Sequence, residues 1–468
     1  MTATAGPDLA RVTVSTPTRR MDVALPENAI VAELLPHLLR HAGDDLADDG
    51  EQHGGWTLRR ATGAALDPTR SLGAQGVRDG ELLNLAPRRA DWPELAYDDI
   101  VEVIASGARR SGRLWSGAAT RTCGLAVAAV LLAVGLLDVL WSGPSWTIPA
   151  VCAAALAVVL IAVGVVLSRS LVDAVAGGVV AGCALPYAFA AGLLATAPSG
   201  AELTDIGAPG LLLGCASLIV AGAIGYVAVA ATLRIFVAGI GTGVAGLIGA
   251  VLVMLGVTAA GSAGIVLTLA IGLLPAYPLM ARGLGGLPMP ALPMKPEEIL
   301  EDRPLPPRDS VFTAVARATE LLSGMLTAAA VVSVFAMATL AAAGGTSARI
   351  LIATAGAALL LRSRLFPIPP QRIPLILSGM LALVVLVIAM IGAADNAATR
   401  LLFLLVIAAV AGATIAGALA YSRRAASPRM GRTADIADVL AIMALVPLAC
   451  AVAGVFHAIQ GLFASVGG

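Results

Sequence analysis

The feature that most constrains this chain is a series of apolar segments that recurs from residue 122 to residue 463. A helix of about 20 apolar residues crosses the hydrocarbon core of a membrane, and a spanning segment must satisfy its own backbone hydrogen bonds there. Hydrophobic residues make up 58% of the 468 residues and charged residues 13%, which is outside the range of soluble domains. The sequence therefore predicts a multi-span α-helical membrane protein.

A window of about 20 residues places about eleven transmembrane helices along the chain. The first six fill residues 122–281, the last five fill residues 320–463, and residues 348–362 form the shortest span. The predicted spans are 122–141, 147–167, 171–195, 209–230, 234–257, 262–281, 320–343, 348–362, 372–393, 398–421 and 435–463.

Residues 282–319 are the one long polar interruption of this apolar series, and they are rich in proline. Proline does not continue a helix, and unpaired backbone groups are not stable in hydrocarbon. We therefore predict a Pro-rich cytoplasmic loop that divides the membrane region into a six-span and a five-span block. Lys295, Arg303 and Arg308 in this loop are candidate docking residues for a partner.

The arginines indicate the orientation of the spans. Alternate loops carry nearly all of them, and the opposite loops hold only Arg349 and Arg400. Because cytoplasmic loops carry the excess of basic residues, the N-terminus and the Pro-rich loop are predicted to be cytoplasmic. An odd number of spans then leaves residues 464–468 as a periplasmic C-terminal end. Residues 1–14 lack an apolar core, so we expect no cleaved signal peptide.

Residues 9–88 are predicted to form a soluble domain, after a disordered stretch at residues 1–8. Apolar residues alternate around Val12–Val14 and Met21–Leu25, which indicates a β-hairpin, and residues 30–42 follow helical spacing. Residues 56–59 and 82–85 indicate two further strands. This order, with the Val-Arg-Asp-Gly-Glu turn before the last strand, resembles the ubiquitin-like β-grasp fold. We interpret the domain as a binding module, with Arg59, Arg60, Arg70 and Arg78 as candidate docking residues.

Residues 89–121 form a basic and amphipathic linker between this domain and the first span. Arg109, Arg110 and Arg113 surround Trp115, and basic residues with tryptophan mark the cytoplasmic interface of a membrane. The short helix expected over residues 97–105 can lie on lipid headgroups or dock to a partner, and the sequence does not choose between these.

Reactive side chains are sparse, so we predict no catalytic site, cofactor or metal, and no enzyme. The five cysteines lie inside spans without ligand spacing, and a third zinc ligand beside His37 and His41 would have to come from His53 in a loop. The net charge is zero, so the overall charge does not predict nucleic-acid binding. Ionisable residues stay near span ends, whereas coupled transporters place them at mid-membrane. A secondary transporter with a regulatory domain is the alternative, and a lipid-handling enzyme is a third option.

Glycines recur with G-x-x-x-G spacing in three spans, which allows helix backbones to approach closely. Either internal packing or a subunit interface would use this spacing. The pairs are Gly178 with Gly182, Gly210 with Gly214, and Gly239 with Gly243.

The whole plan resembles the EccD family, the multi-span membrane component of the actinobacterial type VII (ESX) secretion machinery. The plan joins a ubiquitin-like domain, an arginine-rich linker, eleven spans and a Pro-rich loop after the sixth. The resemblance implies a non-enzymatic subunit of the bacterial inner membrane that dimerises around a lipid-filled vestibule. It implies EccB, the EccC ATPase and EccE-like proteins as partners, together with a second copy and membrane lipids, and no small-molecule substrate. The sequence leans towards the ESX system of iron and zinc homeostasis.

Overall fold

The structure is a computed structural model, and it describes residues 9–16, 19–42, 55–87, 116–171, 173–198, 200–229, 232–287, 307–394, 396–423, 428–456 and 460. The chain divides into two compact units, Met1–Trp115 and Ser116–Gly468. The predicted linker helix at residues 97–105 lies outside the described residues. Each unit is considered by itself below.

The first unit is a four-stranded sheet that carries one helix. Strands β1 (Leu9–Ser15) and β2 (Arg20–Pro26) form the predicted antiparallel hairpin, and helix α1 follows at Val31–Ala42. Strands β3 (Trp56–Arg60) and β4 (Leu82–Pro87) pair antiparallel, and β4 pairs parallel to β1. The sheet order is β2-β1-β4-β3, with a short 3₁₀ helix η2 at Gly73–Gln75. The β-grasp order expected from the sequence is confirmed.

Alternate strand residues build the core of this unit, because successive side chains of a strand point to opposite faces. Val12, Val14, Leu58 and Leu83 are at most 2% exposed and pack with Leu34 and Leu38 of α1. One face of the sheet is therefore buried by the helix.

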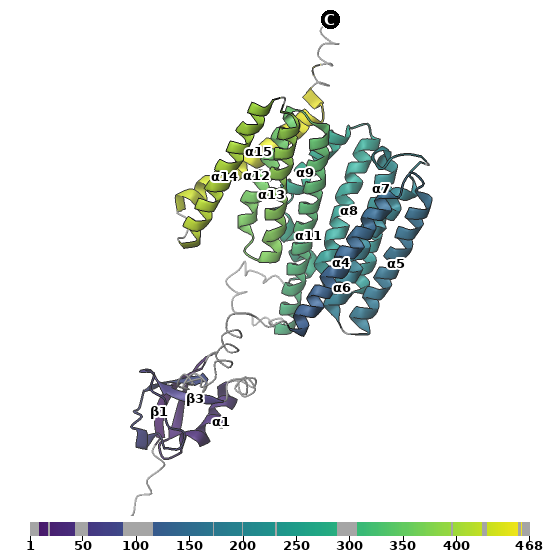
Figure 1. Cartoon of the computed structure of the whole chain (residues 1–468). Helices are drawn as coiled ribbons and strands as arrows, with labels where there is room; N and C mark the ends of the chain where they lie inside the picture. Colours follow the sequence, from purple (N-terminus) through teal and green to yellow (C-terminus); the bar gives the residue numbers. More distant parts are fainter. Residues whose placement is uncertain are drawn as a thin grey trace, which may run out of the picture. The chain divides into compact units, whose positions relative to one another are not determined.

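The second unit is a bundle of apolar helices (Figure 1). The helices in chain order are α4 (Gly117–Trp141), α5 (Thr147–Arg169), α6 (Ala174–Ala195), α7 (Ala208–Ala228), α8 (Leu233–Met254), α9 (Ala259–Gly272), α10 (Tyr277–Gly285), α11 (Arg308–Ala343), α12 (Thr346–Arg362), α13 (Pro369–Gly392), α14 (Ala397–Arg423) and α15 (Pro428–Val452). Short 3₁₀ helices lie at η4 (Leu203–Asp205) and η6 (Ser363–Leu365).

Nine of the described helices are long and apolar enough to cross a membrane, or ten if the bent pair α9 and α10 counts as one span. The predicted number was about eleven, and two elements explain the difference. The sixth span is broken, with a bend of 66° between α9 and α10. Pro275 and Pro278 lie at this break, and proline removes helical hydrogen bonds. The eighth is α12, whose 17 residues reach about 26 Å, less than a hydrocarbon core of about 30 Å.

The predicted bounds of the Pro-rich loop, residues 282–319, were wrong at both ends. Helix α10 continues to Gly285, where Gly286 ends it in the left-handed conformation, with φ 69°. Helix α11 already begins at Arg308 and runs for 36 residues, about 54 Å. Pro307 precedes its first turn and Asp309 lies within it, a position where a carboxylate is stabilised by the helix dipole. The polar composition of residues 308–319 therefore marks an exposed helical extension, not a loop.

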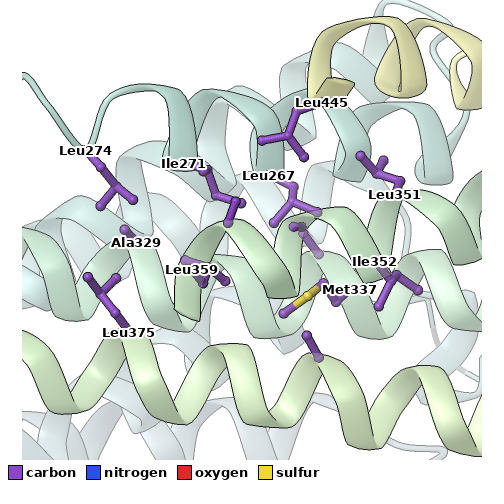
Figure 2. Packing of buried hydrophobic residues seen from close by; sticks show 14 of the residues in the cluster. Leu267, Ile271, Leu274, Ala329, Met337, Leu351, Ile352, Leu359, Leu375 and Leu445 are labelled. Atoms are coloured by element: carbon purple, nitrogen blue, oxygen red, sulfur yellow. The ribbon is translucent and has the colours of Figure 1, made fainter. Parts of the chain in front are cut away.

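Two hydrophobic clusters organise the membrane unit, and their boundary differs from the predicted six-plus-five division. The first joins α5, α6, α7 and α8 around Tyr187 and Phe236. The second joins α9, α11, α12, α13 and α15 around Leu267, Met337 and Leu351, and Figure 2 shows these side chains filling the space between the helices. Helix α9 thus belongs with the helices after the Pro-rich segment, because Leu267 and Ile271 are fully buried among them.

Two apolar helices lie at the margin of the bundle. The membrane-spanning windows of α4 and α14 contain no buried residue, whereas half of the α6 and α11 windows is buried. Helix α14 is seen at one edge of the bundle in Figure 1. Within the described residues, these two helices leave their apolar side chains to lipid or to another protein.

Candidate functional site

The candidate docking arginines of the ubiquitin-like unit do not form one surface. Arg59 and Arg60 are neighbours in β3 and therefore belong to opposite faces of the sheet. The Arg60 guanidinium donates a hydrogen bond to the Gln75 carbonyl and lies 3.5 Å from the Glu81 carboxylate. Arg60 thus connects the η2 segment to the sheet by a hydrogen bond.

Arg70 and Arg78 lie in the turns beside this segment and are exposed. The Arg70 guanidinium donates to the Ala74 carbonyl at 3.2 Å, and the Arg78 backbone N–H donates to the Glu81 carboxylate at 2.9 Å. The remaining candidates separate into two groups. Arg308 is an exposed first residue of α11, and Arg109, Arg110, Arg113, Lys295 and Arg303 lie outside the described residues.

The sheet face opposite α1 carries a polar row that crosses all four strands. The pairing aligns Arg20 of β2 with Ser15 of β1, Ser15 with Asn84 of β4, and Asn84 with Arg59 of β3. All four positions lie on the face away from the core, where Arg20 is exposed and Arg59 is half-buried. Two arginines at the ends of a short polar row make a surface that suits an acidic partner.

The six glycines of the G-x-x-x-G pairs all lie against other helices of the same chain. A methyl group added at Gly178 would overlap the Thr232 hydroxyl, and one at Gly239 would lie 2.9 Å from Leu185. The other four meet neighbours in the same way, at the distances that follow. Added methyl groups would lie 2.9 Å from Ile235 for Gly182, 2.9 Å from the Leu193 carbonyl for Gly210, 2.9 Å from the Phe189 carbonyl for Gly214, and 2.6 Å from Ile219 for Gly243.

Other glycines that the spacing rule missed make closer backbone contacts. A methyl group at Gly164 of α5 would lie 2.7 Å from the Gly177 carbonyl oxygen of α6, and one at Gly177 would lie 2.5 Å from the Gly164 carbonyl oxygen. Gly356 of α12 and Gly379 of α13 also face each other at a longer distance, with added methyl groups 3.5 Å from the Gly379 carbonyl oxygen and 3.1 Å from the Gly356 carbonyl oxygen. The pairs join different helices, so no spacing within one helix reveals them.

Charged side chains gather at one end of the bundle, which we call the arginine end. Arg121 at the start of α4 pairs with Asp173, the N-cap of α6. Arg169 of α5 donates to the last carbonyls of α7, at 2.7 and 3.1 Å. The Arg234 backbone N–H, at the start of α8, donates to the Glu320 carboxylate of α11 at 3.3 Å. Ionisable groups therefore connect neighbouring helices near their ends.

The most buried ion pair at the arginine end joins α12 to α15. Arg362 Nε lies 3.0 Å from Asp438 Oδ2, and the two side chains are 14% and 12% exposed. Neither Arg362 Nε nor Asp438 Oδ1 has an aligned hydrogen-bond partner, so the attraction is chiefly Coulombic. Beside it, Arg364 and Asp435 form a more exposed pair at 3.0 Å. The sequence predicted that ionisable residues lie near span ends, but it did not predict these two pairings.

Metal-binding residues do not gather within the described part of the chain, where no group of three or more His, Cys, Asp or Glu residues is placed to hold an ion. His41 Nδ1 lies 3.0 Å from the His37 carbonyl oxygen, as expected for residues four apart on a helix. His53 lies outside the described residues.

Two apolar grooves follow the seam between the two hydrophobic clusters. The first, which we call the α10 groove, has a volume of about 560 Å³ and is lined by α7, α8, α9, α10 and α11. The second, which we call the α6 groove, has about 580 Å³ and is lined by α6, α7, α8, α9 and α11. Ala245, Val266 and Val332 border both and separate them.

These features define a class of protein: a multi-span α-helical membrane protein whose N-terminal unit has a ubiquitin-like fold. Residues 120–462 match the family described as the EccD-like transmembrane domain. Residues 9–85 match the family described as protein YukD of the WXG100 protein secretion system.

The chain therefore belongs to the EccD family. In two strains of Mycobacterium tuberculosis, the ESX-4 secretion system protein eccD4 is 29% identical to it over 489 residues, covering 98% of both chains. The names of these relatives place them in the ESX-4 system, and they leave the lean towards the ESX system of iron and zinc homeostasis a prediction.

Two solved structures share the fold. Protomer 1 of the ESX-3 core complex is 22% identical, with a TM-score of 0.59 over 96% of this chain and 100% of that chain. A chain of the MycP5-free ESX-5 inner membrane complex is 21% identical, with a TM-score of 0.55 over 88% of this chain and 100% of that chain.

Proposed function

We propose that this protein is a core membrane component of an ESX type VII secretion complex of the bacterial inner membrane. The observation that carries the proposal is the match of residues 120–462 to the EccD-like transmembrane domain, with a YukD-like domain before it at residues 9–85. Relatives and structural neighbours whose names place them in ESX systems support the same role.

The role needs no catalytic centre. Several described ionisable side chains of the membrane unit pair with each other or with helix ends, and the grooves are lined almost wholly by apolar residues. We infer that the protein acts by assembly, without chemistry of its own. Energy comes from a separate ATPase subunit of the EccC type, and EccB- and EccE-like membrane proteins complete the complex.

We assign the contact with a second copy and the docking of the ATPase to particular surfaces of the protein. The apolar faces of α4 and α14 contain no buried residue, and they suit a second copy or another membrane subunit. Two copies would enclose a lipid-lined vestibule. The polar sheet face with Arg20 and Arg59 suits docking of the ATPase to the ubiquitin-like unit. By the positive-inside rule we assign this unit to the cytoplasm. Counting the short helix α12 together with the nine long described helices and the bent pair α9 and α10 gives an odd number of spans, which supports a periplasmic C-terminal end.

Affinity purification of the tagged chain from its native membrane in mild detergent tests the proposal, with mass spectrometry of the bound proteins. We expect an ATPase subunit and two further membrane proteins to co-purify. Removal of residues 1–88 should release the ATPase and retain the membrane subunits. Recovery of the chain alone, together with solute uptake by the pure protein in liposomes, would favour a secondary transporter instead.

A further inference from the structure

The α10 groove has a polar end and an apolar end, and this polarity points to a ligand. Its only lining side chains with polar tips are Tyr226 and Tyr277, and both lie towards the arginine end of the bundle. Towards the middle of the bundle, Ala245, Val266 and Val332 pack together and separate this groove from the α6 groove. A ligand that fits must therefore be apolar along its length and polar at one end.

Two arginines lie one helical turn before the lining residues at the polar end, one on α8 and one on α11, the two helices that we call the floor. Val237, Gly241 and Val244 of α8 line the groove, and Arg234 lies one turn before Val237. Leu321, Met325 and Val332 line it from α11, where Arg317 lies one turn before Leu321. Residues three and four apart share a helix face, so each arginine begins the stripe that lines the groove.

Close helix contacts bring these two stripes together. A methyl group added at Gly324 of α11 would lie 2.7 Å from the Arg234 carbonyl oxygen, and one at Gly241 of α8 would lie 2.7 Å from Ala328. Glu320 is the one described carboxylate at this end of the floor, and it accepts the Arg234 backbone N–H. Arg234, Arg317 and Glu320 leave a net positive charge at the mouth.

The depth of the groove matches one leaflet. On α8 it extends from Val237 to Ile248 and on α11 from Leu321 to Val332, in each case about 16 Å at 1.5 Å per residue. This is about half of a hydrocarbon core of about 30 Å. Helix α10, bent by 66° from α9, closes the side near the membrane surface with Met280 and Leu284.

We propose that the α10 groove is a binding site for one anionic phospholipid of the leaflet at the arginine end. One acyl chain fills the groove as far as Val332, and the phosphate lies at Arg234 and Arg317, with the Tyr226 phenol beside it. The site is built within a single copy of the chain, and it does not depend on the proposed secretion role.

Native mass spectrometry of the full-length protein in detergent tests this, with dioleoyl phosphatidylglycerol and dioleoyl phosphatidylcholine as probes. These lipids share acyl chains and differ in net charge. We expect the wild type to retain phosphatidylglycerol preferentially. Arg234→Gln and Arg317→Gln should each reduce this preference about fivefold, the effect of one basic residue near an anionic lipid surface. Arg372→Gln, an exposed arginine of α13 away from the groove, is the matched control and should leave the preference unchanged.

A second pair of variants tests the acyl chain. Val244 is 45% exposed in the groove, and Val220 is 58% exposed on α7 outside it. Val244→Trp should reduce retention of both lipids, whereas Val220→Trp should not. Should Val244→Trp fail to fold, a phosphatidylglycerol with a photoreactive acyl chain should label α8 between Val237 and Ile248 in the unmodified protein.

Three outcomes would overturn the proposal. The first is an unchanged lipid preference in the Arg234→Gln, Arg317→Gln double variant. The second is labelling spread evenly over the outer helices, which would indicate bulk lipid only. The third is displacement of the lipid by glycerol 3-phosphate, which would show an anion site without an acyl-chain groove.

Discussion

At the scale of single residues, the membrane unit depends on glycines where two helices meet. Gly164 and Gly177 bring α5 and α6 so close that neither position has room for a methyl group. By contrast, a methyl group added at Gly412 or Gly417 of α14 would meet nothing within 4 Å. The same residue type is therefore a packing requirement in one helix and a neutral choice in the other.

Gly164→Ala should lower the stability of the bundle. The added Cβ would meet the Gly177 carbonyl oxygen at 2.7 Å, and overpacking of this kind costs about 1–3 kcal/mol. Thermal unfolding in detergent measures the change, with Gly412→Ala as the matched control. The control should unfold at the wild-type temperature or slightly above it, because alanine is the better helix former. Equal destabilisation by both substitutions would contradict the packing described for α5 and α6.

A second residue-scale prediction concerns the turn before η2. The Thr69 side chain and backbone N–H donate to the Asp67 carboxylate at 2.7 and 2.9 Å, and these hydrogen bonds lower the pKa of Asp67. Thr69→Val should move the pKa back towards its ordinary value of 3.8, as measured by NMR titration of the carboxyl carbon.

The sign of the pH effect follows from this lowered pKa. A group with a lowered folded pKa contributes stability above its unfolded pKa and loses it as pH falls through the folded value. The wild-type turn should therefore lose this stabilisation below about pH 4, and Thr69→Val should show less of this loss.

At the scale of helices, ion pairs near the arginine end decide which segments stay together. Arg362 and Asp438 connect α12 with α15 across a long stretch of sequence, and both are largely buried. Arg364 of η6 and Asp435 of α15 form a neighbouring pair, but Asp435 is 69% exposed. The two pairs should therefore differ in the free energy of unfolding that is lost when one partner is removed, because removal from a buried pair leaves an unpaired buried charge.

Asp438→Ala should destabilise the protein by about 3–5 kcal/mol, because Arg362 would remain buried without its partner. Asp435→Ala, the exposed neighbour, should cost less than about 1 kcal/mol. The double variant Arg362→Met, Asp438→Leu should recover most of the loss. Denaturant titration in detergent micelles compares the four proteins, and similar values for Asp438→Ala and Asp435→Ala would refute the difference in burial.

At the scale of the whole molecule, the chain consists of two units that each have a complete hydrophobic core. Leu58 and Leu83 are fully buried in the ubiquitin-like unit, and Leu267 and Leu351 in the membrane unit. Each unit has the buried apolar side chains that independent folding requires. The two units also differ in the pattern of their apolar residues. Apolar and polar residues alternate in the strands of the first unit, whereas the spans of the second are continuous apolar runs.

Residues 1–115 expressed alone should fold and unfold cooperatively in water. Leu58→Ala should destabilise this fragment by about 2–5 kcal/mol, the usual cost of a large cavity in a core. Urea titration followed by circular dichroism measures this, with Leu9→Ala as the control, because Leu9 is 49% exposed. A fragment without a cooperative transition would show that the unit depends on the membrane region.

The sequence alone determined the fold class, the positions of most helices and the β-grasp order. Apolar runs near the length of a membrane span and strict alternation in strands are local patterns, so they can be read without contacts. They did not show that residues 308–319 are helical, since an exposed helical turn and a polar loop have similar composition. Nor did they show that residues 259–285 are broken into two helices, although Pro275 stood in that span.

Only the tertiary structure decided which segments meet. The contact of Gly164 with Gly177, the pairing of Arg362 with Asp438 and the placement of α9 with the later helices join residues far apart in the chain. It also showed that Arg234 and Arg317 lie one helical turn before residues of two different helices that line the same groove. These are properties of packing between elements, and the periodicity of a single element carries no information about its neighbours.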